Sequence, residues 1–175
     1  ADLKFMKKII SEDTNSQKES IKLSKGLGLV FKMITELPQI TISAVEGPAM
    51  AGAFGIVCSS DLVLSMSSAR FAMTETRLGL SPAQIAPYVI ARLGFSNARK
   101  LILLGFSIDG NQAYDMGLTD YLSTTKEEFN ETLNSIKRQV NQCAPHALTL
   151  TKNIIRPRNE IDIDLSAKIF ADCIE

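Results

Sequence analysis

Apolar residues follow two different periods along the first half of the chain. From Ile21 to Leu37 they recur close to the helical period, and Pro38 ends that run. The stretches QITISAV, LVLSM and RFAMT are short, apolar and rich in residues that strands favour. We therefore expect one long helix followed by three buried strands, with a further helix around residues 51–59 between the first two strands.

Helical patterns dominate the second half. PYVIARLG and NARKLILLG predict a pair of helices ending at Gly94 and Gly105, and DGNQAYDMG predicts a short helix before a strand in LTDYLS. Thr124 and Glu127 have the spacing of a capping box that opens a helix to about residue 142. Helices that start near Pro145 and Asp164 complete an α/β chain with a helical C-terminal part.

The N-terminal stretch is less regular. LKFMKKII is expected to form a short helix, and the polar run Ser11 to Ser20 reads as a mobile loop. The chain begins with Ala1 rather than Met and ends inside a helical pattern. We therefore expect it to be a part of a longer protein at both ends.

Small residues cluster in VEGPAMAGAFGIVCSSDLVLS, between a predicted strand and a predicted helix. A turn of this kind exposes free N–H groups at the positive end of the helix dipole, which suits an oxyanion or a phosphate. The G-x-G-x-x-G and G-K-[ST] patterns of nucleotide-binding turns are absent. The residues alone therefore leave two alternatives open, an anion site and a tightly packed turn.

Composition excludes several classes of protein. Nineteen basic and nineteen acidic residues cancel in a chain of 175, so no net charge favours nucleic acid or an anionic membrane as a partner. No apolar run reaches the length of a spanning helix, and no signal peptide is evident. The three cysteines and the single His146 match no metal-ligand spacing, so we expect a reduced, cytoplasmic protein without a metal.

Three blocks together resemble the crotonase (enoyl-CoA hydratase/isomerase) superfamily: ADLKFM, VEGPAMAGAFGIVCSSDLVLSMSSARFAMTETRLGLSP and LILLGFSIDGNQAYDMGLTDYLS. The resemblance implies a spiral of ββα units with a helical C-terminal region used in oligomerisation. Residues 1–124 would be the core, lacking its N-terminal part, and residues 125–175 the incomplete helical region. It also implies acyl-CoA thioester substrates, no separate cofactor, and a homotrimer or a hexamer.

The resemblance assigns an oxyanion hole to two backbone N–H groups. Ala1, just before an Asp, matches the family's first donor, and Gly52 matches the middle residue of its GGG turn. Met50 and Ala51 would line the substrate beside that turn. Donors aimed at a developing negative charge often supply the largest catalytic effect.

The resemblance also locates the acid–base group. One family glutamate is replaced here by Gly55, and an acidic position used by dienoyl isomerases is Ala83. The glutamate of the F-x-x-x-E segment is present as Glu75, which would act alone, with a pKa raised by apolar surroundings. Taken by itself, Glu75 reads instead as a surface residue paired with Arg70 or Arg77.

The loop that follows Glu75 is expected to close the pocket. Its sequence, RLGLSPAQIAP, departs from the PGxGG of short-chain hydratases and resembles hydratases of branched glutaconyl-type CoA esters. Pro82 and Gln84 are predicted to contact the substrate, although Gln84 could equally be a surface residue at a helix start. Asp61 and Cys58 are expected to be structural.

These observations lead to one main hypothesis, an enoyl-CoA hydratase that adds water across the double bond of an acyl-CoA. An enoyl-CoA isomerase of the same fold would use Glu75 to move a proton between carbons. A non-catalytic acyl-CoA-binding paralogue is the third alternative, favoured by the missing carboxylate at Gly55.

Overall fold

The computed structural model describes residues 16–155 and 163–172. Its helices are α2 (Ser16–Glu36), α3 (Gly52–Ser59), the 3₁₀ helix η1 (Glu75–Leu78), α4 (Ala86–Leu104), α5 (Gly110–Asp115), α6 (Lys126–Asn141), α7 (Pro145–Ile155) and α8 (Ile163–Asp172). Its strands are β1 (Ile42–Val45), β2 (Pro48–Met50), β3 (Leu62–Met66), β4 (Arg70–Ala72), β5 (Ser107–Asp109) and β6 (Tyr121–Ser123). The α/β class predicted from the sequence is confirmed.

The six described strands form two small sheets, and strands that follow one another along the chain, such as β1 and β2, belong to different sheets. One sheet has the order β1-β3-β6 and is parallel, with Ile42 opposite Leu62. The other has the order β2-β4-β5, in which β2 and β4 are parallel and β5 is antiparallel. Twice in succession, two strands in different sheets are followed by a helix: β1-β2-α3, then β3-β4 with α4 after η1. This is the ββα repeat expected from the sequence.

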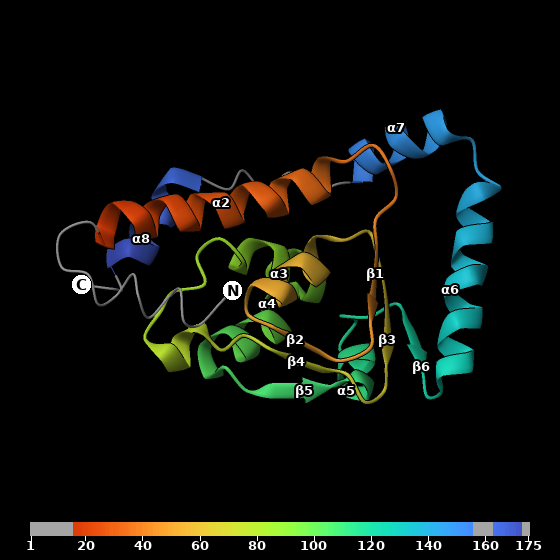
Figure 1. Ribbon diagram of the computed structural model, residues 1–175, viewed down its shortest axis with the longest axis horizontal. Coiled ribbons are helices and arrows are strands. Elements are labelled where there is room, and N and C mark those ends of the chain that lie inside the picture. Colours follow the sequence, from red (N-terminus) through yellow and green to blue (C-terminus); the bar gives the residue numbers. More distant parts are fainter. Residues whose placement is uncertain (1–15, 156–162, 173–175) are drawn as a thin grey trace.

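The main core lies between the sheets and the helices α2, α3 and α4 (Figure 1). Phe31 of α2, Phe54 of α3 and Phe71 of β4 are fully buried there, and the last two rings contact each other edge to face. Edge-to-face contact is a favoured arrangement of aromatic rings. Helix α3 therefore rests on large side chains, and its first turn is held at a fixed place beside β4.

Helix α2 is longer than its apolar pattern predicts. It begins at Ser16, so the loop expected up to Ser20 is wrong from Ser16 onward. Ser20 and Ser24 are buried on the same face as Phe31, and α2 packs there against α8. Small polar residues permit close packing of helices but give no apolar signal, which is why the helix start was missed. The short helix predicted in LKFMKKII lies outside the described residues.

Three other local features differ from the sequence predictions, namely two strands and one helix cap, and a predicted helix pair is confirmed. Strands β2 and β5 have only three residues each, too short for a period to show, and were not predicted. Helix α6 is capped one residue later than expected: the Thr125 side chain accepts a hydrogen bond from the N–H of Glu128. The Glu128 carboxylate accepts the N–H of Thr124 at 2.7 Å, and these bonds lower its pKa. The predicted helix pair is confirmed, because Gly94 has a left-handed φ of 69° within α4.

Helix α7 is attached to the core through a partly buried ion pair. Lys152 is 5% exposed and its ammonium donates to the Asp61 carboxylate at 2.7 Å and to the Gln39 carbonyl at 2.9 Å. The same Asp61 oxygen accepts the N–H and the hydroxyl of Thr41 at 2.7 and 2.8 Å. The expectation that Asp61 is structural agrees with these contacts.

None of the described helices combines the length and hydropathy that crossing a membrane requires.

Candidate active site

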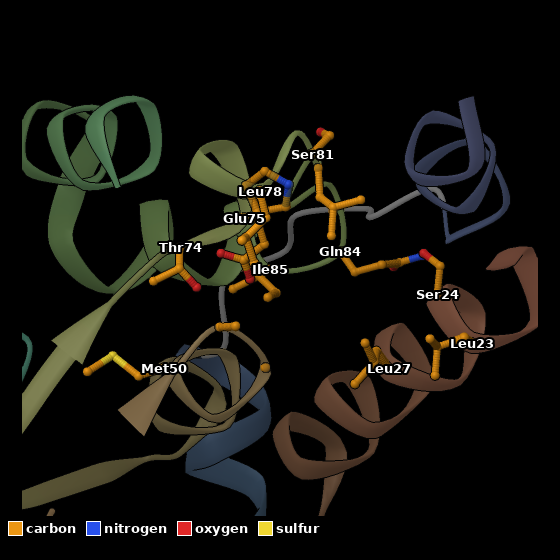
Figure 2. A pocket seen from close by; sticks show the side chains of 14 residues that line it. Leu23, Ser24, Leu27, Met50, Thr74, Glu75, Leu78, Ser81, Gln84 and Ile85 are labelled. Carbon is orange, nitrogen blue, oxygen red and sulfur yellow. The ribbon is translucent and has the colours of Figure 1, made fainter. Parts of the chain in front are cut away.

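A mostly apolar pocket of about 190 Å³ lies between α2, the start of α3 and the segment from Thr74 to Ile85 (Figure 2). It brings together six residues that the sequence assigned to the site: Met50, Ala51, Gly52, Glu75, Pro82 and Gln84. The chain separates the first and the last of these by more than thirty positions. Ala1, the predicted first oxyanion donor, lies outside the described residues.

The sequence missed one wall of the pocket. Leu23, Ser24 and Leu27 of α2 line it opposite Glu75. Leu27 belongs to the apolar pattern that predicted α2, but periodicity alone does not tell which helix faces a cavity. Only the distance between α2 and the loop after η1, which the fold decides, makes these residues part of the site.

The turn before α3 presents a helix N-terminus to the pocket. Gly52 is the first residue of α3, and the N–H groups of a first helical turn have no carbonyl partner within the helix. Ala51, which precedes it, donates its own N–H to the Ala72 carbonyl of β4 at 3.0 Å. The turn is thereby fixed to the sheet, and Gly52 lines the pocket as the first residue of the helix.

Ala51 has a strained backbone. Its φ of 50° and ψ of −119° lie in a region that glycine adopts readily, and it is the only non-glycine with positive φ among the described residues. Such strain costs about 1–3 kcal/mol and concentrates at functional sites. The conformation turns the chain from β2 into α3 within one residue.

Glu75 is the titratable residue of the pocket. It is 7% exposed and its Oε2 has no hydrogen-bond partner. Burial raises the pKa of this carboxyl above its usual value, an effect that a hydrogen bond from its own backbone N–H partly opposes. The alternative of a surface ion pair is wrong, because Arg70 lies 3.7 Å from Asp109 and Arg77 donates to the Leu104 carbonyl.

The turn that carries Glu75 is fastened to the end of α4. The Thr76 hydroxyl donates to the Ile102 carbonyl at 3.2 Å, and Arg77 Nε donates to the Leu104 carbonyl at 3.1 Å. These bonds also satisfy carbonyls at the C-terminus of α4 that have no intrahelical partner. Glu75 is thus held by two contacts across the chain, not only by its own short helix.

Gly55 is closely packed where a second glutamate was considered. A Cβ atom built on Gly55 would lie 2.6 Å from Cζ of Phe31 and 3.2 Å from Cγ2 of Ile85. Phe31 is fully buried and contacts Tyr88 edge to face, so its ring has little freedom to move. The described part of the site therefore has one carboxylate on its floor, and the packing excludes another at this position.

Gln84 is buried, so its alternative placement on the surface is wrong. Its side chain is directed toward α2, as Figure 2 shows, and its amide N–H groups donate to the Ser24 hydroxyl at 3.3 Å and to the Ile163 carbonyl at 3.0 Å. Its Oε1 atom has no hydrogen-bond partner. Pro82, in the same loop, accepts the N–H groups of Ile85 and Ala86 at the start of α4.

Other candidate residues lie away from this chemistry. His146 is exposed. Burial raises the pKa of the Cys58 thiol to about 12, so this side chain is a packing group at neutral pH. Within the residues that the structure describes, no cluster of His, Cys, Asp and Glu could hold a metal ion.

Comparisons with known proteins identify the family. A model described as enoyl-CoA hydratase/isomerase matches residues 4–170. The chain is 36% identical to the crystal structure of an enoyl-CoA hydratase/isomerase from Marinobacter aquaeolei, with a TM-score of 0.74 over 87% of this chain and 60% of that one. For a crotonase structure from Legionella pneumophila the identity is 29% and the TM-score 0.79, over 94% and 63% of the two chains.

A curated relative agrees with this match. The short-chain-enoyl-CoA hydratase of Clostridium acetobutylicum is 30% identical over 149 residues, which are 82% of this chain and 57% of that protein. The chain thus spans about 60% of the length of the relatives it matches. The similar structures also confirm the crotonase-type fold. By sequence and by fold, this chain belongs to the enoyl-CoA hydratase/isomerase family.

Proposed function

We propose that this protein adds water to an α,β-unsaturated acyl-CoA, with Glu75 as the acid–base group for both proton transfers. The observation that carries the proposal is the pocket itself. A buried carboxyl with an unpartnered oxygen shares an apolar cavity with Gly52, the first residue of a helix. Burial raises the pKa of this carboxyl, and a raised pKa suits a group that both takes up and returns a proton.

The steps follow from this arrangement. Ionised Glu75 takes a proton from water while the water oxygen bonds to the β-carbon of the substrate. The electron pair of the double bond moves toward the thioester, whose oxygen becomes negative and accepts the N–H of Gly52. Protonated Glu75 then gives a proton to the α-carbon. The sum is the addition of one water molecule, and Glu75 returns to its starting state.

The second oxyanion donor in this proposal is the N–H of Ala1, which rests on the resemblance of ADLKFM to the family. Met50 and Ala51 contact the thioester side of the substrate. The family also supports a homotrimer or a hexamer. Branched glutaconyl-type CoA esters are among the candidate substrates, because the loop RLGLSPAQIAP resembles that of hydratases acting on such esters.

The packing of Gly55 favours a second candidate function. With no carboxylate at that position, Glu75 is the one titratable group among the described residues that line the pocket, and moving a proton between two carbons needs no more than one such group. An enoyl-CoA isomerase is therefore the alternative. A non-catalytic acyl-CoA-binding protein is the third, and it predicts binding without turnover.

A labelled-water experiment separates these candidates. Straight, methyl-branched and glutaconyl-type enoyl-CoAs are incubated with the protein in H₂¹⁸O, and products are read by mass spectrometry and by loss of the enoyl-thioester absorbance. A hydratase incorporates ¹⁸O into a 3-hydroxyacyl-CoA, whereas an isomerase yields an unlabelled product of unchanged mass. Unchanged substrate throughout the panel would overturn both enzymatic proposals.

Two matched variants test the role of Glu75. Glu75→Gln should lose ~10²–10⁴-fold in rate, the usual contribution of a general acid–base group. Glu127→Gln makes the same chemical change at an exposed position of α6 and should keep the wild-type rate. Full activity in the first variant would refute the assignment of the base.

A further inference from the structure

Gln84 joins three separate segments at one end of the pocket. It lies in the loop between η1 and α4, and its amide N–H groups bond to Ser24 of α2 and to the carbonyl of Ile163, the first residue of α8. Figure 2 shows its side chain crossing from the loop to α2, between Glu75 and α8. At 4% exposure it is as buried as its neighbour Ile85, which is 5% exposed.

Gly28 makes room for this crossing. A Cβ atom on Gly28 would collide with Oε1 and Cδ of Gln84. A glycine inside a helix is unfavourable, and so is a buried amide oxygen without a partner. The contact between Gly28 and Gln84 links the helical glycine to the unpaired amide oxygen, because the amide fits against α2 only where α2 has no side chain.

The start of α8 is fixed at the same place. Lys25 and Asp164 form an ion pair at 2.5 Å, and Asp164 directly follows Ile163, whose carbonyl accepts from Gln84. Helix α8 packs along α2 with Ala167 and Ala171 buried. The end of the pocket near Gln84 is thus backed by a second helix, and the amide is held in position on both sides.

We propose that Gln84 is the end wall of the pocket and that it restricts the acyl group to a short chain. The inference rests on the proposed function, since it assigns the acyl group to this cavity. A cavity of about 150 Å³ accommodates one benzene molecule, so about 190 Å³ suits an acyl group of roughly six carbons. A longer chain would have to displace Gln84 from between the loop and α2.

Binding of saturated acyl-CoAs tests this wall without requiring turnover. Dissociation constants for chains of four, eight and twelve carbons are measured by calorimetry for the wild type, Gln84→Ala and Gln84→Met. The alanine variant should shift the ratio of twelve-carbon to four-carbon affinity by about tenfold or more toward the long chain. The methionine variant, similar in length but unable to hydrogen-bond, should keep most of the wild-type preference.

A change at Gly28 tests the same wall from the other side and remains informative if Gln84→Ala does not fold. Gly28→Ala improves helix propensity and pushes the amide away from α2 into the pocket. Affinity for the eight-carbon chain should then fall relative to the four-carbon chain. An unchanged chain-length profile in the folded variants, or an equal shift in Gln84→Ala and Gln84→Met, would overturn the proposal.

The outcomes separate this inference from the proposed reaction. A shifted length profile in a protein that converts no enoyl-CoA would support the wall and refute the hydratase. Hydration with a length profile that Gln84→Ala leaves unchanged would do the opposite. Absence of binding to every acyl-CoA would overturn both.

Discussion

Two carboxylates with low exposure, Asp61 and Glu75, have opposite surroundings. One oxygen of Asp61 accepts three hydrogen bonds, from the N–H and hydroxyl of Thr41 and from the buried ammonium of Lys152. Glu75 is more deeply buried, yet its Oε2 has no partner and burial raises its pKa. A structural carboxylate is satisfied by the fold, whereas a reactive one is left for a ligand to satisfy.

The largest expected effect is on the catalytic rate, when each of the two carboxylates is replaced by its amide. Glu75→Gln should lower the rate ~10²–10⁴-fold without lowering the melting temperature, because its Oε2 accepts no hydrogen bond in the fold. Asp61→Asn should lower the melting temperature while folded molecules keep their rate. Rates per folded molecule, with folding followed by circular dichroism, check both; a large rate loss in Asp61→Asn would erase the contrast.

A pH series sharpens the same comparison. The pKa of Glu75 is raised in the folded state, so its contribution to stability is complete below the unfolded value and is lost as pH rises through the folded value. Glu75→Gln stays neutral throughout. The free energy of unfolding of the variant should therefore gain on that of the wild type as the pH rises above about 4. Urea unfolding at several pH values measures this, and a constant difference would contradict a raised pKa.

Lys152→Met should have the next largest effect, on stability alone. It leaves the Asp61 carboxylate partly buried without its counter-ion, a change that costs about 3 kcal/mol. The double variant with Asp61→Asn should cost less than the sum of the two, because the side chains act as one unit. Denaturant unfolding of the four proteins completes the cycle; additive costs would show that the pair is not coupled.

Gly55→Ala should destabilise by about 2 kcal/mol, because the new methyl group meets the Phe31 ring. Gly26→Ala is the matched control, since a Cβ on Gly26 has no neighbour within 4 Å. That variant should be neutral or slightly more stable through its better helix propensity. Equal thermal stability of the two variants would mean that Phe31 yields easily and that the pocket floor is not fixed.

The smallest effect is expected at Ala51, where the site stores backbone strain. Ala51→Gly relieves the strain of the positive φ and should therefore stabilise the protein. The gain should be about 1 kcal/mol or less, because the greater entropy of glycine in the unfolded chain opposes it. Thermal unfolding measures this gain in stability, which has the opposite sign to the loss expected for Gly55→Ala. A loss of stability in Ala51→Gly would show that the turn is not strained.

Elements with a clear apolar pattern or a marking glycine could be predicted from the sequence, whereas very short or polar ones could not. The strand at Leu62–Met66 and the break at Gly94 follow from pattern and glycine placement. Strand β5 and the start of α2 carry too few apolar residues to be seen, and their positions depend on packing across the chain.

The site shows the same division. The pocket collects Glu75 and the Gly52 turn, which family resemblance had paired, but their catalytic roles stay predictions. That Glu75 is buried and unpaired could not follow from its charged neighbours, because Arg70 and Arg77 find partners elsewhere in the fold. The contribution of Leu23 and Ser24 depends on where α2 crosses the loop, which no local pattern encodes.

The contact between Phe31 and Gly55 also constrains how this chain could evolve. A glutamate introduced at position 55 would first meet the ring, whereas Phe31→Ala made first would open a void costing about 3–5 kcal/mol. Either order passes through a destabilised intermediate, so the two positions are epistatic. A lineage with this packing cannot acquire a second carboxylate there by one tolerated substitution.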